Sequence, residues 1–351
     1  MKALSIMDND EFTKNCNVTF IIGNGFDLGL GMKTKYTDVY DGYIYSPSKS
    51  QVISDFKTEL QSHNSDNYKN WSDFEMAMAE YARRLTSEDE LIECVRDFKG
   101  FMVNHLKQEN NRMLELINDK GYLNNLVKEF ERSLDLFYIG LTRNDINSIK
   151  NLLNNANIER QYVSFNYTST FEAFLILRFK SQKILENTPI HIHGDLNNDV
   201  VLGIDNIEQL KYTPYLLTRK GKRAFVKTIF NEQYDKTRVE TAEKIISQSN
   251  IICVYGFSMG ESDKTWTDLL ANWLIENPEH HLVVYQYDET EYNYYNRDEI
   301  MDVEDEKKEL LLKKLRIDNE QILNQIHIPI GEKLFNFSFT KIERPLELSV
   351  L

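Results

Sequence analysis

Four short segments of this sequence combine glycine, amide, imidazole, hydroxyl and carboxylate groups, and each follows a run of residues that predicts a strand. The first comes after the β-branched run 18–22, which has no polar alternation and therefore predicts a strand buried on both faces. Glycines between a buried strand and a helix let backbone N–H groups approach a phosphate. We therefore predict a nucleotide-binding loop made of Gly23, Asn24, Gly25, Phe26 and Asp27.

The spacing of these glycines argues against two common phosphate-binding motifs. The loop reads G-x-G-x-x-x-G rather than G-x-G-x-x-G, and no second strand is predicted within about thirty residues to supply a ribose-binding acid. An ordinary dinucleotide-binding dehydrogenase is therefore disfavoured. The P-loop is excluded because no G-K-[ST] follows. A tight strand-to-helix turn without a ligand stays the alternative.

The second and third segments supply an amide and an imidazole. Asn166 follows the predicted strand 161–165, where it could face a ligand or cap the next helix. His191 and His193 lie two residues apart, so both could share one face of a strand. A metal pair without a third ligand is a weak signal. We predict His193 as a general base near neutral pH, against the alternative of a buried histidine that only satisfies the core.

The fourth segment is a second glycine loop after a strand. Gly256, Ser258 and Asp263 lie in the stretch 255–263, between a predicted strand and a predicted helix, and we predict that they contact a nucleotide. The stretch also matches the G-x-S-x-G pattern of esterases. That interpretation is disfavoured because His327 is the only histidine after it in a plausible loop.

The elements that must position these residues alternate along the chain. Strands alternating with helices predict an α/β fold with a doubly wound parallel sheet. The helical stretch 51–158 interrupts the alternation after the first strand and helix, with four or five helices and no convincing strand. We therefore predict an α/β domain from 1–50 and 159–351 with an inserted helical domain at 51–158. The predicted strands are 18–22, 161–165, 189–193, 200–203, 250–256 and 281–286, and the helices outside the insertion are 33–45, 168–180, 239–248, 263–276 and 303–325.

Composition narrows the class of protein. The 351 residues carry a formal net charge of −14, which opposes a broad nucleic-acid-binding surface. One basic run, from Lys211 to Lys227, departs from this balance, and such a run is usually a solvated face that could still meet phosphates. The three cysteines form no C-x-x-C pair, which indicates reduced thiols. No apolar run approaches the roughly 20 residues of a membrane span, and the first 17 residues do not resemble a signal peptide, so we expect a cytoplasmic protein.

In this order, the segments resemble the bacteriophage abortive-infection family AbiH. The resemblance extends over about residues 18–290. It is carried by 20–28 with Gly31, Thr34 and Tyr36, by Trp71-Ser72-Asp73-Phe74-Glu75, and by the segments 165–168, 191–194 and 256–263. It implies a role in defence against phage.

The same layout is similar, more distantly, to the sirtuin fold, a variant of the Rossmann fold that surrounds NAD. The resemblance implies that Asn166 positions water and the nicotinamide ribose, and that His193 acts as base on the ribose hydroxyls. Two positions depart from the sirtuin pattern: Asp27 stands in place of a serine and Thr168 in place of an aspartate. The sirtuin zinc module is absent from the sequence, so protein deacylation is not implied.

Three functions follow as hypotheses. The first is cleavage of the N-glycosidic bond of NAD or a related nucleotide, with NAD as substrate or ligand, no metal, and Asp27 or Glu75 stabilising a developing cation. The second is a nuclease that uses both histidines and the basic run. The third is a nucleotide sensor that triggers growth arrest through a partner. A homo-oligomer and a phage-derived trigger are also expected partners.

Overall fold

The computed structural model describes residues 14–62, 71–118, 120–179, 188–209, 218–286, 297–331 and 333–337. Its centre is a parallel six-stranded sheet in the order β3-β2-β1-β4-β5-β6. This is the order of doubly wound nucleotide-binding folds, so the predicted parallel α/β sheet is confirmed. The strands are β1 (Lys14–Ile22), β2 (Ala156–Ser164), β3 (Ile190–His191), β4 (Ile251–Tyr255), β5 (His281–Tyr285) and β6 (Ile326–His327).

Helices connect every pair of consecutive strands, as parallel pairing requires. The longest connection joins β1 to β2 and contains the helices α1 to α7. The α-helices of the described residues are α1 (Gly25–Gly29), α2 (Tyr36–Ile44), α3 (Gln51–Ser62), α4 (Trp71–Tyr81), α5 (Glu88–Asn118), α6 (Lys120–Asp135), α7 (Arg143–Leu153), α8 (Thr170–Phe179), α9 (Arg219–Phe225), α10 (Lys227–Tyr234), α11 (Lys236–Ser247), α12 (Lys264–Glu276) and α13 (Arg297–Leu315).

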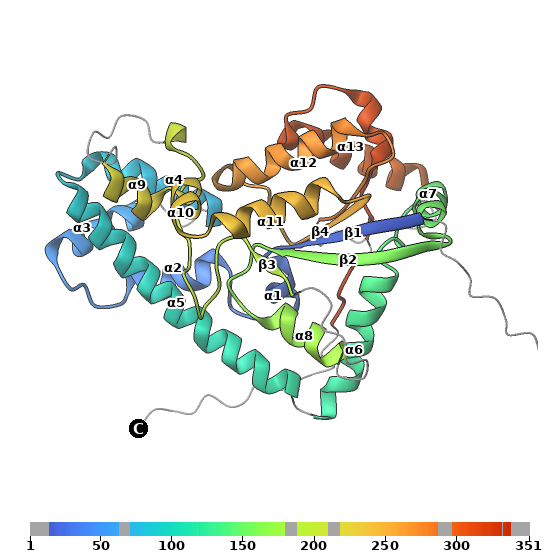
Figure 1. Cartoon of the computed structure of the whole chain (residues 1–351). Coiled ribbons are helices and arrows are strands. Elements are labelled where there is room, and N and C mark those ends of the chain that lie inside the picture. The colour runs from blue at the N-terminus through green and yellow to red at the C-terminus, as the bar shows by residue number, and fades with distance from the viewer. Residues whose placement is uncertain are drawn as a thin grey trace, which may run out of the picture.

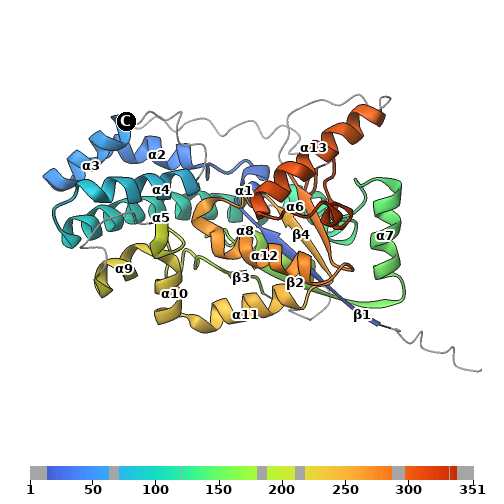
Figure 2. The same cartoon turned by 90° about the horizontal axis from the view of Figure 1, so that it is seen from above.

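Both faces of the sheet are covered. Phe20 and Ile22 of β1 belong to a core shared with α6 and α8, whereas Ile21 between them belongs to a core shared with α11, α12 and α13. Figures 1 and 2 show these two groups of helices on opposite sides of the strands. The unbroken apolar run of β1 follows from this placement, because each of its side chains meets a helix layer.

A third core lies beyond the carboxyl ends of the strands. It contains buried side chains of α2, α3, α4 and the first half of α5, together with Leu202 and Phe225 from the later segment 196–226. Figure 1 shows α9 and α10 beside α4 and α5 at this end of the molecule. The rest of the helical stretch, from Met113 through α6 and α7, packs on the sheet. How the chain divides into domains stays a prediction.

Several predicted boundaries are wrong, and the reasons are local. The strand predicted at 189–193 is only β3, because the chain turns at Gly194, which has φ +74°. The segment 200–203 is not a strand: Val200 and Leu202 enter the third core, and the bridge in this region is formed by Ile204 with Val226. β2 begins at Ala156, inside the predicted helical insertion.

At the end of the chain, the helix predicted at 303–325 stops at Leu315, where Arg316 has φ +56° and the Ile317 N–H returns to the Leu312 carbonyl. A 3₁₀ turn, Glu320–Gln325, and β6 follow, and neither was predicted. The three cysteines are buried and free. None of the helices in the described ranges is long and apolar enough to cross a membrane.

Candidate functional site

The carboxyl ends of the first four strands meet at one edge. The Gly23 N–H donates to the Tyr255 carbonyl at 2.8 Å, and the Phe165 N–H donates to the Ile22 carbonyl at 2.8 Å. The β2 end in turn accepts from the Ile192 N–H at 2.9 Å. β1 and β4 are the neighbours at which strand order reverses, and doubly wound sheets bind ligands outside the strand ends at that point. The four chemistry-bearing segments therefore belong to one region.

The two glycine loops pack backbone against backbone. The Gly25 N–H donates to the Gly256 carbonyl at 3.1 Å, and a Cβ placed on Gly25 would lie 2.4 Å from the Gly256 Cα. Gly256 also has φ +70°. These contacts explain why glycine stands here without any ligand. The N–H groups of Gly23 and Gly25 are occupied, so a phosphate would have to meet other donors, and the role of these glycines in binding a nucleotide stays a prediction.

Two further residues of the first loop have structural partners. The Asn24 side chain donates to the Thr34 carbonyl at 2.8 Å and accepts from the Thr34 hydroxyl at 2.7 Å. Phe26 is fully buried, with its ring against those of Phe171 and Phe335 among others. A ligand at this loop could meet only the backbone of Phe26.

Asp27 is buried beneath the loop and bonded to the segment that follows β2. The hydroxyls of Thr168 and Thr170 each donate to its carboxylate at 2.6 Å. Burial raises the pKa of Asp27 to about 6, against the lowering effect of the two hydroxyls. Asp27 and Thr168 are the two departures from the sirtuin pattern, and the structure shows that they are partners of one another.

The strand ends also enclose a buried ion-pair network. The Lys227 ammonium donates to Glu75 Oε2 at 2.8 Å, to Asp263 Oδ1 at 3.1 Å and to the Ser262 carbonyl at 3.0 Å. The other Glu75 oxygen accepts from the Gly203 N–H at 3.0 Å. Lys227 ends the basic run that the sequence placed on a solvated face. For this residue that placement is wrong, since its side chain is 4% exposed.

The network shifts the pKa values of its members in different directions. Burial would raise the pKa of Asp263, but Lys227 and His193 hold it well below its usual range. Burial disfavours a charged ammonium, yet Asp263 and Glu75 raise the pKa of Lys227 above its usual value. The pKa of Glu75 is raised, chiefly by burial, although Lys227 opposes the shift. Glu75 reaches the site as the sequence suggested, but as the partner of a lysine.

His193 faces this network from the end of the β3 segment. Its Nε2 lies 3.0 Å from Asp263 Oδ1, within ion-pair distance, but the direction of this contact does not satisfy hydrogen-bond geometry, so Nε2 is buried without a hydrogen-bond partner. The rings of Phe165 and Tyr167 pack against the imidazole, with centroids 5.4 and 6.2 Å away. The residues on both sides of Asn166 therefore contact His193.

Asn166 carries the clearest unsatisfied group. Its residue is 5% exposed, and both amide atoms, Oδ1 and Nδ2, are buried without a hydrogen-bond partner. The alternative role as a helix cap does not apply, because α8 begins at Thr170 and Oδ1 accepts no bond. Only the Asn166 main chain is engaged: its N–H donates to Ser164 Oγ at 3.2 Å, and its carbonyl contacts His191 Nδ1 at 2.7 Å.

The two histidines of the H-x-H pair have different environments. His191 is held between the Asn166 carbonyl and the Glu172 carboxylate, whereas His193 faces Asp263. Burial would lower the pKa of His191, but Glu172 raises it overall. The pair therefore does not converge as two ligands, and the described residues contain no group of three or more His, Cys, Asp or Glu side chains arranged to hold a metal.

In the last segment, Ser258 is exposed, and its carbonyl accepts from Lys314 Nζ at 2.8 Å. Thr170, Ser262 and Tyr167 contact the site but were not predicted as site residues. All three lie within or beside the segments 165–168 and 256–263, so they could have been found by including the polar residues that flank each strand end.

Comparison with known protein families matches residues 19–285 to "Bacteriophage abortive infection AbiH". The match covers more than half of the chain. The chain belongs to the AbiH family. Each of the four strand-end segments begins within the matched range. No curated protein matches the chain. The likeness to sirtuins stays a prediction.

Proposed function

We propose that this AbiH protein acts in abortive infection by cleaving the N-glycosidic bond of NAD or a related nucleotide at the edge formed by β1 to β4. The proposal rests on two buried side chains, Asn166 and His193, which have polar atoms without a hydrogen-bond partner beside the point where strand order reverses. Leaving a buried polar group unsatisfied costs about 1–3 kcal/mol. Such groups persist where a ligand completes their hydrogen bonds.

Hydrolysis of this N-glycosidic bond uses one amide, which orients groups, and one base, which accepts a proton. The bond between ribose C1′ and the nicotinamide nitrogen breaks with its electrons leaving on nicotinamide, and a water oxygen bonds to C1′. The Asn166 amide can accept from that water and donate to a ribose oxygen. His193 takes the proton of a ribose hydroxyl or of the water, and the products are nicotinamide and ADP-ribose.

The carboxylates near the strand ends can stabilise the positive charge that develops on the ribose. Of the two residues considered from sequence, Glu75 is already paired with Lys227, whereas Asp27 accepts only neutral hydroxyls. With a pKa of about 6, Asp27 is ionised at neutral pH. Asp27 is therefore the better candidate for electrostatic stabilisation.

Access to the site requires movement. Asn166 and His193 are each 5% exposed, so a nucleotide can meet their side chains only when neighbouring segments shift. A closed resting state suits a defence protein that must not consume nucleotide in uninfected cells. We therefore also propose that a signal of infection moves the segments that cover Asn166 and His193.

The test compares unpaired residues with paired ones of the same type. Purified wild type, alone and with extract of phage-infected cells, is incubated with NAD, and nicotinamide release is measured. Asn166→Ala and His193→Ala should lower kcat by about a hundredfold or more.

The matched controls are Asn110→Ala and His280→Ala, which remove buried side chains bonded to Ser169 and to the Trp273 carbonyl. They should lose stability and keep kcat within a few-fold. Turnover that survives both site substitutions would remove Asn166 and His193 from the mechanism. Tight nucleotide binding with no turnover under either condition would favour the sensor.

A further inference from the structure

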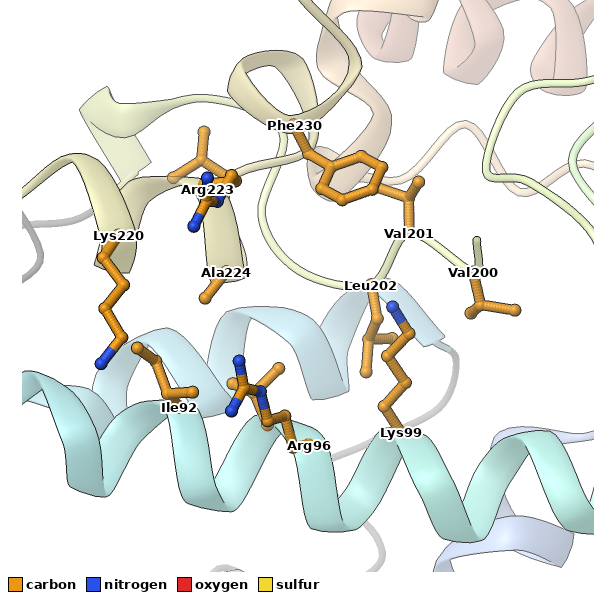
Figure 3. A pocket seen from close by; sticks show the side chains of 12 residues that line it. Ile92, Arg96, Lys99, Val200, Val201, Leu202, Lys220, Arg223, Ala224 and Phe230 are labelled. Carbon is orange, nitrogen blue, oxygen red and sulfur yellow. The ribbon is translucent and has the colours of Figure 1, made fainter. Parts of the chain in front are cut away.

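A second candidate site is a cavity of about 230 Å³ between α5 and the α9–α10 segment, with residues 200–202 along one wall. Figure 3 shows Arg96 and Lys99 rising from α5, with Lys220 and Arg223 of α9 on the facing side. Two elements far apart in the sequence thus bring four cations to one cavity. This gathering runs against the chain's net charge of −14.

Only one of the four cations forms a direct ion pair with a described residue. Lys220 pairs with Asp89, but no ion pair joins Arg96, Lys99 or Arg223 to any carboxylate of the described residues. Desolvation lowers the pKa of Lys99; the nearby Asp199 carboxylate opposes this shift, and Arg96 adds to it. Lys220 and, less strongly, Arg96 lower the pKa of Asp89, so two carboxylates lie near the four cations. The residues that line the cavity are themselves free of acidic side chains, and a cluster of like charges around one cavity attracts anions.

The other residues that line the cavity limit the size and chemistry of the ligand. Apolar side chains, among them Ile92, Leu202 and Phe230, form the walls between the cations. A cavity of 230 Å³ is smaller than the roughly 300–1,000 Å³ that encloses a whole drug-sized ligand. It suits the phosphate end of a ligand. Guanidinium groups on two sides can each form paired hydrogen bonds with phosphate oxygens.

We propose that this cavity binds a diphosphate group. Arg96 and Arg223 hold it together with Lys99, in the space between α5 and residues 200–202. The site is separate from the strand-end residues, and the proposal does not depend on NAD cleavage. Two sources share this chemistry: free diphosphate, and a nucleoside diphosphate whose base lies outside the cavity.

The cavity wall is bonded directly to the strand-end region. The Val201 N–H donates to the His193 carbonyl at 2.8 Å, and the Val201 carbonyl accepts from the Tyr167 hydroxyl at 2.9 Å. Val226, another lining residue, immediately precedes the buried Lys227. An anion that shifts either wall would therefore move groups that touch His193, and the cavity is placed to regulate that region.

The experiment measures binding to the full chain by isothermal titration calorimetry, using inorganic phosphate, diphosphate and ADP as probes. Diphosphate should bind the wild type, with affinity that falls as salt rises. The double substitution Arg96→Gln with Arg223→Gln should weaken it at least tenfold. Lys236→Met is the matched control, because Lys236 is paired with Glu240 away from the cavity and should leave affinity unchanged.

The unfolding midpoint of the ligand-free double variant provides a second measurement. It should match that of the wild type, since Arg96 and Arg223 are exposed and neither forms a direct ion pair with a described residue. Equal affinity for diphosphate and ADP identifies the free anion as sufficient, and tighter ADP binding identifies a nucleotide; both support the site. Absence of binding by all three probes, or equal binding by wild type and double variant, would overturn the proposal.

Discussion

Two groups of buried polar residues lie at the same edge of the sheet and differ in one respect. In the paired group, Glu75, Lys227 and Asp263 satisfy one another, and a backbone N–H completes Glu75. In the unpaired group, Asn166 and His193 are as deeply buried, yet three of their side-chain atoms have no hydrogen-bond partner, although one of them, His193 Nε2, lies 3.0 Å from Asp263 Oδ1. Burial alone therefore does not distinguish residues that support the fold from residues that we propose to bind substrate.

The difference assigns distinct roles to the two groups. The paired group joins α4, α10 and the loop before α12, so it holds the helical stretch onto the strand ends. The three unsatisfied atoms of the unpaired group form no hydrogen bond that links elements of the fold. Substitutions should accordingly destabilise the fold in the first group and leave it intact in the second, while removing function from the second.

The largest effect is expected for Lys227→Met. It leaves the Glu75 and Asp263 carboxylates buried without their cation, which should cost about 3–5 kcal/mol of unfolding free energy in urea. Lys220→Met is the control, because the Lys220–Asp89 pair is exposed and screened by solvent, so its loss should leave the free energy of unfolding almost unchanged. A loss below about 1 kcal/mol for Lys227→Met would show that the network does not support the fold.

The next effect concerns the contact between the two glycine loops. Gly25→Ala places a Cβ 2.4 Å from the Gly256 Cα, and the forced separation should destabilise the protein by about 2–4 kcal/mol. Gly100→Ala is the matched control in α5, where an added Cβ meets nothing within 4 Å. It should stabilise by about 0.5–1 kcal/mol. If both substitutions had the same effect in thermal unfolding, close loop packing would not be the reason for Gly25.

Asp27 predicts a dependence of stability on pH. Its pKa is about 6 in the folded chain against 3.8 ordinarily, so the folded state binds more protons between these values and loses stability as pH rises through them. Relative to Asp27→Asn, the wild type should lose about 2 kcal/mol between about pH 4.5 and 7. Urea titrations of both proteins across this range measure the difference. A difference that stays flat or grows in favour of the wild type would contradict the shift.

The smallest effect on stability should come from Asn166→Leu. An apolar side chain of similar size removes two unsatisfied atoms, so stability should stay unchanged or rise by about 1 kcal/mol. Asn110→Leu should instead cost about 1–3 kcal/mol, because it deprives the Ser169 N–H of its acceptor. Equal losses for the two substitutions would mean that Asn166 has a structural partner after all.

The sequence predicts the sheet and the strand-end segments because their signals are local. An apolar run followed by glycine marks β1, and a similar pattern marks β4. Asn166 and His193 are placed at the same edge of the sheet because parallel strands end at one edge. β6 escaped prediction because two residues at the end of a helical pattern carry no periodicity.

The paired group could not be predicted from local composition. Lys227 stands in a run of cations that resembles a solvated face, and its partner Glu75 lies 152 residues away. Only the packing of α10 against α4 decides that this lysine is buried. The hydrogen bonds from Thr168 and Thr170 to Asp27 could not be predicted for the same reason, since the donors lie 141 and 143 residues from the acceptor.

The most direct test of the central claim is a crystal structure of the chain with ADP-ribose. We expect the ribose to lie within hydrogen-bond distance of the Asn166 amide and of the His193 imidazole, so that their unsatisfied atoms gain hydrogen bonds. The proposed mechanism would be contradicted if ADP-ribose bound while both side chains stayed without hydrogen bonds, or if both turned to bond other protein groups instead.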